Sequence, residues 1–121
     1  MFTSKFLAAL LFATSFTLVA QNEADAHLRT ALKFADLYNS ADAAPHFAEA
    51  ERLSIAEGNQ PKALHARLGR IRATVEQERR NLPAVSLEIE EELATNPLLQ
   101  SRQDLRMFAW IVKGDVESEA N

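Results

Sequence analysis

Proline and glycine divide this chain into short segments, and this division limits what it can fold into more than any other feature. Pro45, Pro61 and Pro83 each stand where a helix can begin, because proline is well tolerated in the first helical turn. Gly58 is typical of a helix C-terminus, and Asn96-Pro97 ends a segment because the residue before a proline disfavours helical geometry. The intervals between these residues have the length of ordinary helices, about three to four turns.

Apolar residues recur at helical spacing inside these segments. The clearest stripe lies in the third segment and consists of Leu64, Leu68, Ile71 and Val75. We expect six helices, starting near residues 27, 45, 61, 83, 101 and 115. The third is expected to end near Asn81, the fifth to run over residues 103–113, and Gly114 to separate the last two. No segment alternates apolar and polar residues between turns, as a strand does, so the sequence predicts an all-α fold.

The N-terminus has the layout of a secretory signal peptide. Lys5 supplies the positive charge, and Phe6–Ala20 follows without a charged residue. That stretch is short for a membrane-spanning helix, which needs about 20 predominantly apolar residues. Cleavage is expected after Ala20 or after Ala26, where Ala24-Asp25-Ala26 fits the small-residue pattern. A buried N-terminal helix and an uncleaved membrane anchor are the alternatives.

This reading assigns residues 1–26 to a signal peptide and residues 27–121 to a helical domain. We therefore expect the protein to be periplasmic or secreted. Its contact with a membrane is expected only through the signal segment, if that segment is not cleaved.

Composition removes several classes of function. The formal net charge is -4 and the pI is near 5.4, whereas nucleic-acid binding needs a basic face, so we expect no nucleic-acid partner. The absence of cysteine excludes disulfides, zinc–thiolate clusters and thiol nucleophiles. The serines lack a nucleophile-elbow motif, and Gly58, Gly69 and Gly114 are isolated instead of forming a phosphate-binding loop. The sequence predicts a protein that is not an enzyme and holds no cofactor.

Two groups of polar residues suggest chemistry, but each also has a structural explanation. His27, His46 and His65 are evenly spaced, and three histidines can bind zinc. One helix plus a turn has the same length, however, and no two of them lie one turn apart, so we predict no metal site. Glu88 and Glu90–Glu92 form an acidic run that a solvated face near a helix N-terminus explains. Because the third helix is basic and the fourth acidic, the two are expected to exchange ion pairs, each worth about 0–1 kcal/mol.

Alternate helix starts recur at about 32 to 40 residues, a period typical of stacked helix hairpins. Several positions resemble the tetratricopeptide-repeat family, whose pattern is W-x2-L-G-x2-Y, then A-x3-F, then P. Ala43-x3-Phe47 fits the second-helix element and Leu68-Gly69 reproduces the L-G pair, while His27 and His65 stand where the tryptophan would be. The middle unit exceeds the family period by about four residues, at Glu78–Leu82. Another helical-repeat class or an irregular bundle is therefore the alternative.

The resemblance implies antiparallel helix hairpins stacked as a short right-handed solenoid over residues 27–121. In that family the first helix of each hairpin lines a concave groove, where carboxylate-rich peptide ends dock. By this resemblance Arg67, Arg70 and Arg106 face the groove and bind an acidic peptide through bidentate contacts. The implied function is a non-catalytic scaffold that binds a protein or peptide on its concave face. The alternative is a periplasmic sensory or docking portion of a larger signalling protein whose output domain is absent.

The C-terminal end carries an unbroken apolar run, Phe108–Val112. A helix that is apolar on every side must be covered on every side, and only Val116–Asn121, about two turns, follows it. We therefore expect either that the helical domain is incomplete at its C-terminus, as part of a longer repeat protein, or that it forms a homodimer through this end.

Overall fold

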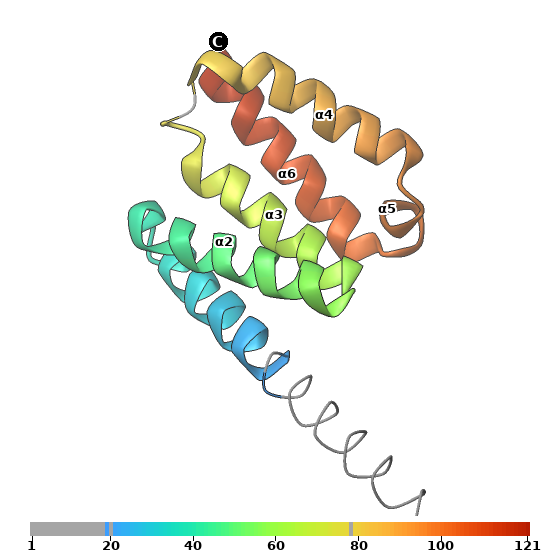
Figure 1. Ribbon diagram of the computed structural model, residues 1–121. Coiled ribbons are helices and arrows are strands. Elements are labelled where there is room, and N and C mark those ends of the chain that lie inside the picture. The colour runs from blue at the N-terminus through green and yellow to red at the C-terminus, as the bar shows by residue number, and fades with distance from the viewer. Residues whose placement is uncertain (1–18, 20, 78) are drawn as a thin grey trace, which may run out of the picture.

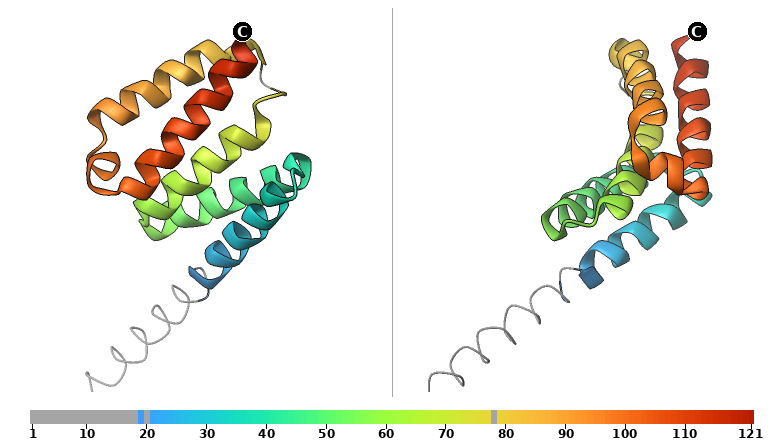
Figure 2. Two further views of the ribbon diagram at one scale, coloured as in Figure 1. Left: turned by 180° about the vertical axis from the view of Figure 1, so that it is seen from behind. Right: turned by 90° about the vertical axis from the view of Figure 1, so that its right-hand side faces the viewer.

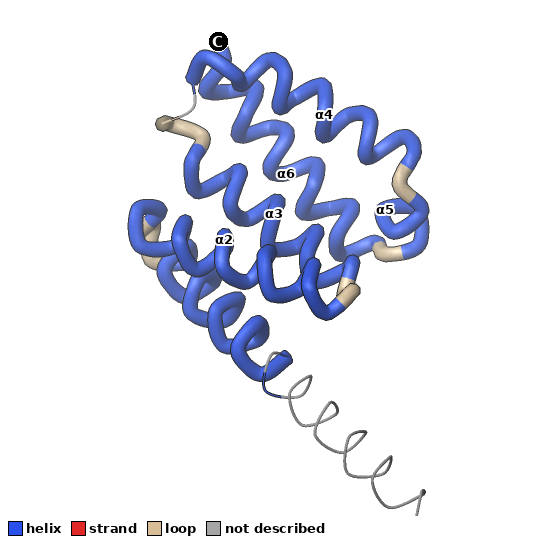
Figure 3. Tube along the Cα trace, viewed as in Figure 1, coloured by secondary structure: helices blue, strands red, loops and turns tan. Residues whose placement is uncertain are grey.

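The computed structural model describes residues 19, 21–77 and 79–121, apart from the side chain of Arg80. A first helix covers residues 21–36. It is followed by α2 (Ser40–Glu57), α3 (Gln60–Thr74), the 3-10 helix η1 (Arg79–Asn81), α4 (Leu82–Thr95), α5 (Pro97–Ser101) and α6 (Gln103–Ala120). Figure 3 shows these helices joined by short loops, with no strand in the described part of the chain. The prediction of an all-α fold is confirmed for these residues.

The long helices are stacked in the order first helix, α2, α3, α6, α4, and neighbours in the chain run in opposite directions (Figure 1). The first helix lies against α2, α2 against α3, and α6 lies between α3 and α4. The right-hand view of Figure 2 shows α6 and the first helix on one side of the molecule, with α2 and α4 on the other. The arrangement is compatible with a helical-repeat fold.

Side-chain caps fix where the helices begin. The amide oxygen of Asn39 accepts a hydrogen bond from the backbone N–H of Asp42 at 3.3 Å, and Asn59 does the same for Lys62 at 3.2 Å. Each of these caps satisfies a backbone donor that has no partner within its helix. Gly58 ends α2 in the left-handed conformation, with φ of 73°, which glycine adopts without steric cost. The predicted end of the second helix at Gly58-Asn59 is confirmed.

Two expected helix boundaries are wrong. Helix α2 begins at Ser40 instead of at Pro45, because the Asn39 cap starts the helix earlier and Pro45 is accommodated inside it. Gly114 does not break the chain into two helices. Helix α6 continues through it because Val112 and Val116, one turn apart on either side, are both fully buried. The burial of these two side chains outweighs the helix-propensity cost of glycine, about 1 kcal/mol.

The third helix is shorter than expected, and one helix was not expected. Helix α3 ends at Thr74, whose hydroxyl donates back to the carbonyl of Arg70 at 2.9 Å, and turn residues follow it. The short α5 follows Asn96, whose side chain caps it by accepting from the N–H of Leu98 at 3.0 Å. These differences move boundaries without changing the all-helical architecture.

The core consists of two groups of buried side chains. The larger lies between α3, α4, α5 and α6 and includes the predicted stripe of the third helix, with Leu64 and Leu68 buried and Ile71 and Val75 packed against them. The smaller lies between the first helix and α2, around Ala31, Ala43 and Phe47. Burying a leucine or phenylalanine side chain contributes about 1.5–3 kcal/mol. The mutual burial of neighbouring helices therefore holds the stack together.

The predicted signal peptide falls mostly outside the described residues. Within it, residues 21–26 form the start of the first helix, in which Ala24 is fully buried. Asp25 lies 2.6 Å from the ammonium of Lys62 at the start of α3. The folded unit therefore includes residues before the expected boundary at residue 27. Cleavage after Ala20 would preserve these contacts, whereas cleavage after Ala26 would remove them.

Candidate functional site

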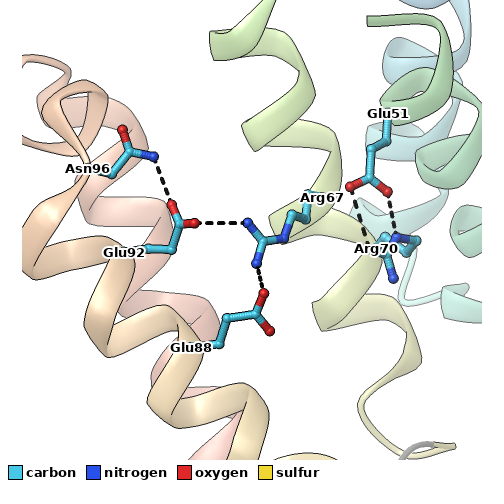
Figure 4. A network of polar contacts seen from close by, with 6 residues as sticks. All are labelled: Glu51, Arg67, Arg70, Glu88, Glu92 and Asn96. Carbon is cyan, nitrogen blue, oxygen red and sulfur yellow. Dashed lines mark hydrogen bonds and ion pairs between the residues drawn. The ribbon is translucent and has the colours of Figure 1, made fainter. Parts of the chain in front are cut away.

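Arg67, the first of the predicted partner-binding arginines, contacts the neighbouring α4. Its Nη1 donates to Glu92 Oε1 at 3.2 Å and its Nη2 pairs with Glu88 (Figure 4). Asn96 donates to the other oxygen of Glu92 at 2.7 Å. The predicted exchange of ion pairs between a basic third helix and an acidic fourth helix is confirmed at this position.

Arg70 contacts α2 instead. Its Nε and Nη2 donate to the two carboxylate oxygens of Glu51 at 2.9 and 3.5 Å (Figure 4). A guanidinium that binds both oxygens of one carboxylate is held in a defined orientation. Arg106 lies exposed on α6. The structure therefore does not bring the three arginines together, and two of them already have carboxylate partners within the chain.

A groove lies on the other side of α3. It is a cavity of about 570 Å³ lined mainly by the first helix, α3 and α6, with contributions from α2 and from the loops that follow the first helix and α3. From α3 it is lined by His65, Gly69, Arg72 and Ala73. The resemblance placed Arg67, Arg70 and Arg106 in such a groove, but none of them is among its lining residues. Residues two apart on a helix point about 200° apart, so Arg67 and Arg70 face α4 and α2 when His65, Gly69 and Arg72 face the groove. A role for the three arginines in binding a partner stays a prediction.

The floor of the groove is apolar, and Gly69 shapes it. The first helix contributes Leu32 and α6 contributes Phe108, while the ring of Phe47 reaches the groove from α2 beneath Gly69. A Cβ atom at Gly69 would lie 2.3 Å from Cε1 of Phe47, well inside van der Waals contact. Because Gly69 has no side chain, α3 can pack directly on the buried phenylalanine. The leucine–glycine pair of the sequence pattern therefore has a packing role here.

Carboxylates dominate the rim of the groove. Five of the described lining residues are acidic and one is an arginine: Asp36, Glu76, Asp104, Asp115 and Glu119, with Arg72. Arg72 lies 2.6 Å from Asp115. Arg102 donates to Asp104 at 2.9 and 3.0 Å, and this contact lowers the pKa of Asp104 to about 2. The groove is therefore negatively charged at neutral pH.

His65 adds no positive charge to the floor at neutral pH. Its ring meets Phe108 edge to face, with the ring centroids 5.3 Å apart. Burial lowers the pKa of His65 below its usual value of 6.5, because the charged form is poorly solvated there. The neutral imidazole and the phenyl ring together continue the apolar floor between α3 and α6.

The three helices that line the groove run in the same direction (Figures 1 and 2). Their C-terminal ends therefore lie at the same end of the groove, where Asp36, Glu76 and Glu119 are found. A helix C-terminus carries the equivalent of about half a negative charge. Tyr38 is also at this end, 95 % exposed, with a left-handed backbone φ of 56°. This end combines acidic side chains, helix C-termini and an exposed aromatic ring.

The evenly spaced histidines do not form one cluster. His27 and His46 meet across the first helix and α2, with their Nδ1 atoms 3.0 Å apart, so that one ring donates a hydrogen bond to the other. Phe34 stacks on His46, with ring centroids 5.8 Å apart. His65 lies in the groove instead. Within the described ranges, no group of three or more histidine, aspartate or glutamate side chains is placed to hold a metal ion.

The apolar run of the last helix is only partly covered. Ala109 and Val112 are buried, whereas Met107, Trp110 and Ile111 are 60, 56 and 45 % exposed. These three side chains lie on the face of α6 that points away from the core, and we call them the α6 stripe. The described part of the chain therefore covers one side of this helix and leaves an apolar stripe exposed on the other.

Comparison of the chain with protein-family models, with curated proteins and with solved structures gave no match. Among the helices of the described part, none has both the length and the apolar character needed to cross a bilayer.

The residues that line the groove were not predicted as a site from the sequence, although the sequence contains one signal of them. His65, Gly69 and Arg72 recur at intervals of four and three, which places them on one face of α3. That face carries a glycine and charged residues and is therefore not recognised by an apolar periodicity. Tyr38 gave no signal, because its position depends on how the first helix ends.

Proposed function

We propose that this protein is an exported, non-catalytic interaction scaffold, and that its concave groove binds another protein or an extended peptide. The observation that carries the proposal is the groove itself. Three separate helices line it, its floor is apolar and its volume of about 570 Å³ lies within the usual range of ligand sites. Helices hold the lining residues in place before binding, so little ordering entropy is lost when a partner docks.

The tetratricopeptide-like assignment is part of this proposal. The packing of Phe47 beneath Gly69 supports it, because both positions belong to the sequence pattern of that family. The helices that line the groove are the first helix, α3 and α6, which are the first members of successive hairpins if α2 and α4 are the second members. A right-handed solenoid with its concave face at the groove would place these helices on the inside.

The alternative is that the chain is the docking portion of a larger signalling protein. The α6 stripe favours this alternative, because an exposed apolar stripe of this kind is suited to contact with further protein. The two proposals differ in the surface that binds a partner. A scaffold uses the groove, and a docking portion also uses the α6 stripe.

A groove-filling substitution tests the scaffold proposal. Ser118 is exposed on α6 and lines the groove, so Ser118→Trp fills the groove without disturbing the core. Ala94→Trp adds the same side chain at an exposed position of α4, outside the lining residues, and is the matched control. Tagged chains with each substitution are used for affinity capture from cell-envelope extracts. Proteins recovered with the wild type and with Ala94→Trp should be missing with Ser118→Trp.

Identical recovery with all three chains would show that the groove is not the binding surface. Circular dichroism and thermal melting of each variant establish that the substitutions leave the fold intact. Export is tested separately, by locating the tagged chain in cell fractions. Retention of the full-length chain in the cytoplasm would contradict the proposed localisation.

A further inference from the structure

We propose that the groove takes a cationic peptide segment, which sets apolar side chains on the floor and a lysine or arginine at the end where the first helix, α3 and α6 terminate. This inference rests on the proposed function, because it assumes that the groove is a binding surface. It adds the chemical class of the partner, and it reverses the charge that the family resemblance implied.

Charge complementarity is the first argument. Of the five acidic residues that line the groove, Asp36 and Glu76 have no ion pair among the described side chains. The other three pair with exposed arginines, and an exposed pair is worth only about 0–1 kcal/mol. An incoming ammonium or guanidinium group can therefore interact with two unpaired carboxylates and can exchange with the existing partners of the rest. An acidic segment would be repelled by Asp36 and Glu76, and it would have to compete with carboxylates that already hold the nearby arginines.

The end of the groove is the second argument. Three helices terminate along this edge of the groove, and a helix C-terminus favours a cation placed close to it by about 0.3–1 kcal/mol. Tyr38 lines the same end with its ring almost fully exposed. A lysine or arginine placed over an exposed aromatic face gains about 0.5–1 kcal/mol from the ring. The carboxylates, helix ends and ring all favour the same sign of charge.

The apolar floor identifies the cation as part of a peptide. A small polyamine would satisfy the carboxylates but would leave the partly exposed side chains of Leu32 and Phe108 facing water. A peptide carries apolar side chains and a basic one at fixed spacing along one backbone. Ser40 and Ser118 also line the groove, and a serine hydroxyl can both donate a hydrogen bond to a peptide backbone and accept one from it. A segment with adjacent basic and apolar residues therefore fits the whole lining.

Arg72 is the only described arginine in the lining. Its removal should raise the affinity for a cationic peptide, whereas removal of a carboxylate should lower it. Arg72 neutralises Asp115 and opposes a cationic ligand directly. Replacing it with glutamine removes one positive charge and releases one carboxylate. Arg72→Gln should therefore tighten the binding of a basic peptide, whereas loss of a residue that merely shapes the groove would weaken it.

Selection from a random peptide library displayed on phage is the experiment. The immobilised full chain is the target, and the Ser118→Trp chain removes peptides that bind elsewhere. Enrichment of peptides that combine lysine or arginine with apolar residues supports the inference. Enrichment of acidic or uncharged peptides overturns it and leaves the groove as a binding surface. Failure to enrich any peptide overturns the inference. Affinity capture with the Ser118→Trp chain tests the proposed function independently of this selection.

The affinity of one enriched peptide for the wild-type chain and for substituted chains then shows which charged residues contribute to its binding. The double substitution Asp36→Asn with Glu76→Gln should weaken its binding about tenfold, and Arg72→Gln should strengthen it. The control, Glu90→Gln with Glu91→Gln, makes the same charge change at exposed positions of α4 outside the groove lining and should leave the affinity near the wild-type value. If both double substitutions weakened binding equally, the net charge of the protein would explain the effect, and the proposal that the peptide binds in the groove would be wrong. Equal affinity for spermidine and for the peptide would identify a small cation as the ligand and overturn the peptide inference.

Discussion

Replacing Gly69 with alanine sets two effects of opposite sign against each other at one position of α3. Alanine has a higher helix propensity than glycine, which favours the variant by about 1 kcal/mol. Its Cβ atom, however, would lie 2.3 Å from Cε1 of Phe47 and 2.6 Å from two further ring atoms. Ordinary contacts between carbon atoms begin near 3.5 Å, so the ring or the helix must move by about an ångström.

The cost of that movement exceeds the gain in propensity. The ring of Phe47 is 1 % exposed and packs with Ala31 and Ala43, so it is surrounded by atoms that must shift with it. Overpacking of a well-packed core typically costs about 1–3 kcal/mol, and a clash with three ring atoms belongs at the upper end of that range. The net destabilisation should therefore be about 1–2 kcal/mol. For a domain of this size it lowers the melting temperature by about 5–15 °C.

Thermal melting followed by circular dichroism measures the effect, and Gly114 supplies the matched control. Both glycines lie inside helices, but a Cβ atom at Gly114 would have no neighbouring heavy atom within 4 Å. Gly114→Ala should therefore raise the melting temperature, whereas Gly69→Ala lowers it. In a Phe47→Leu background the cost of Gly69→Ala should shrink, because the smaller side chain leaves room. A higher melting temperature for Gly69→Ala alone would refute the packing argument.

Four further predictions follow from individual contacts. Lys62→Met should reduce the free energy of unfolding by about 1–3 kcal/mol in urea titrations, because it removes the 2.6 Å contact with Asp25 and the ammonium 4.0 Å from the 3 % exposed carboxylate of Glu57. Glu57→Gln in the same chain should recover the part of the loss that comes from Glu57. Burial lowers the pKa of His65 below 6.5, so the unfolded state binds a proton more readily than the folded state, and stability falls as the pH drops below about 6.5. His65→Gln should flatten that part of the plot of melting temperature against pH. Mass spectrometry of the exported chain should show cleavage after Ala20, since a chain cleaved after Ala26 would lose buried contacts of the first helix. If the α6 stripe pairs with a second copy, sedimentation should show a dimer that Ile111→Lys converts to monomer, and a monomeric wild type would exclude this pairing.

The parts of the fold that local rules could predict are those in which one rule acts alone. The stripe of Leu64 and Leu68 identified the buried face of α3, and Gly58 identified the end of α2. The rules failed where local preference and tertiary packing disagreed. Local preference predicts a helix start at Pro45, because proline is well tolerated in the first helical turn, and a break at Gly114, because glycine is unfavourable in a helix interior. An earlier cap in one case and two buried valines in the other outweighed them, and neither effect is visible in the residue's immediate neighbours.

The candidate site was less predictable because it depends on which way each face of α3 points. Arginines occur on several faces of that helix, and the family resemblance assigned Arg67 and Arg70 to the groove. The sequence also indicated that a basic third helix pairs with an acidic fourth helix, and that indication already conflicted with placing Arg67 in the groove. Arg67 binds Glu88 and Glu92 in the structure, so the charge pattern was the better guide. Glu51, the partner of Arg70, belongs to no motif and could not have been singled out.

The charge of the groove follows from the same placement. Arg67 and Arg70 contact α4 and α2, where they neutralise carboxylates away from the groove (Figure 4). The chain as a whole carries an excess of acidic over basic residues, and Arg72 is the one guanidinium among the described groove residues. Because Arg67 and Arg70 join α3 to α4 and α2, they do not offset the carboxylates of the groove. The contacts that hold the stack together therefore also give the groove its negative charge, and that charge favours a basic partner over the acidic one that the resemblance implied.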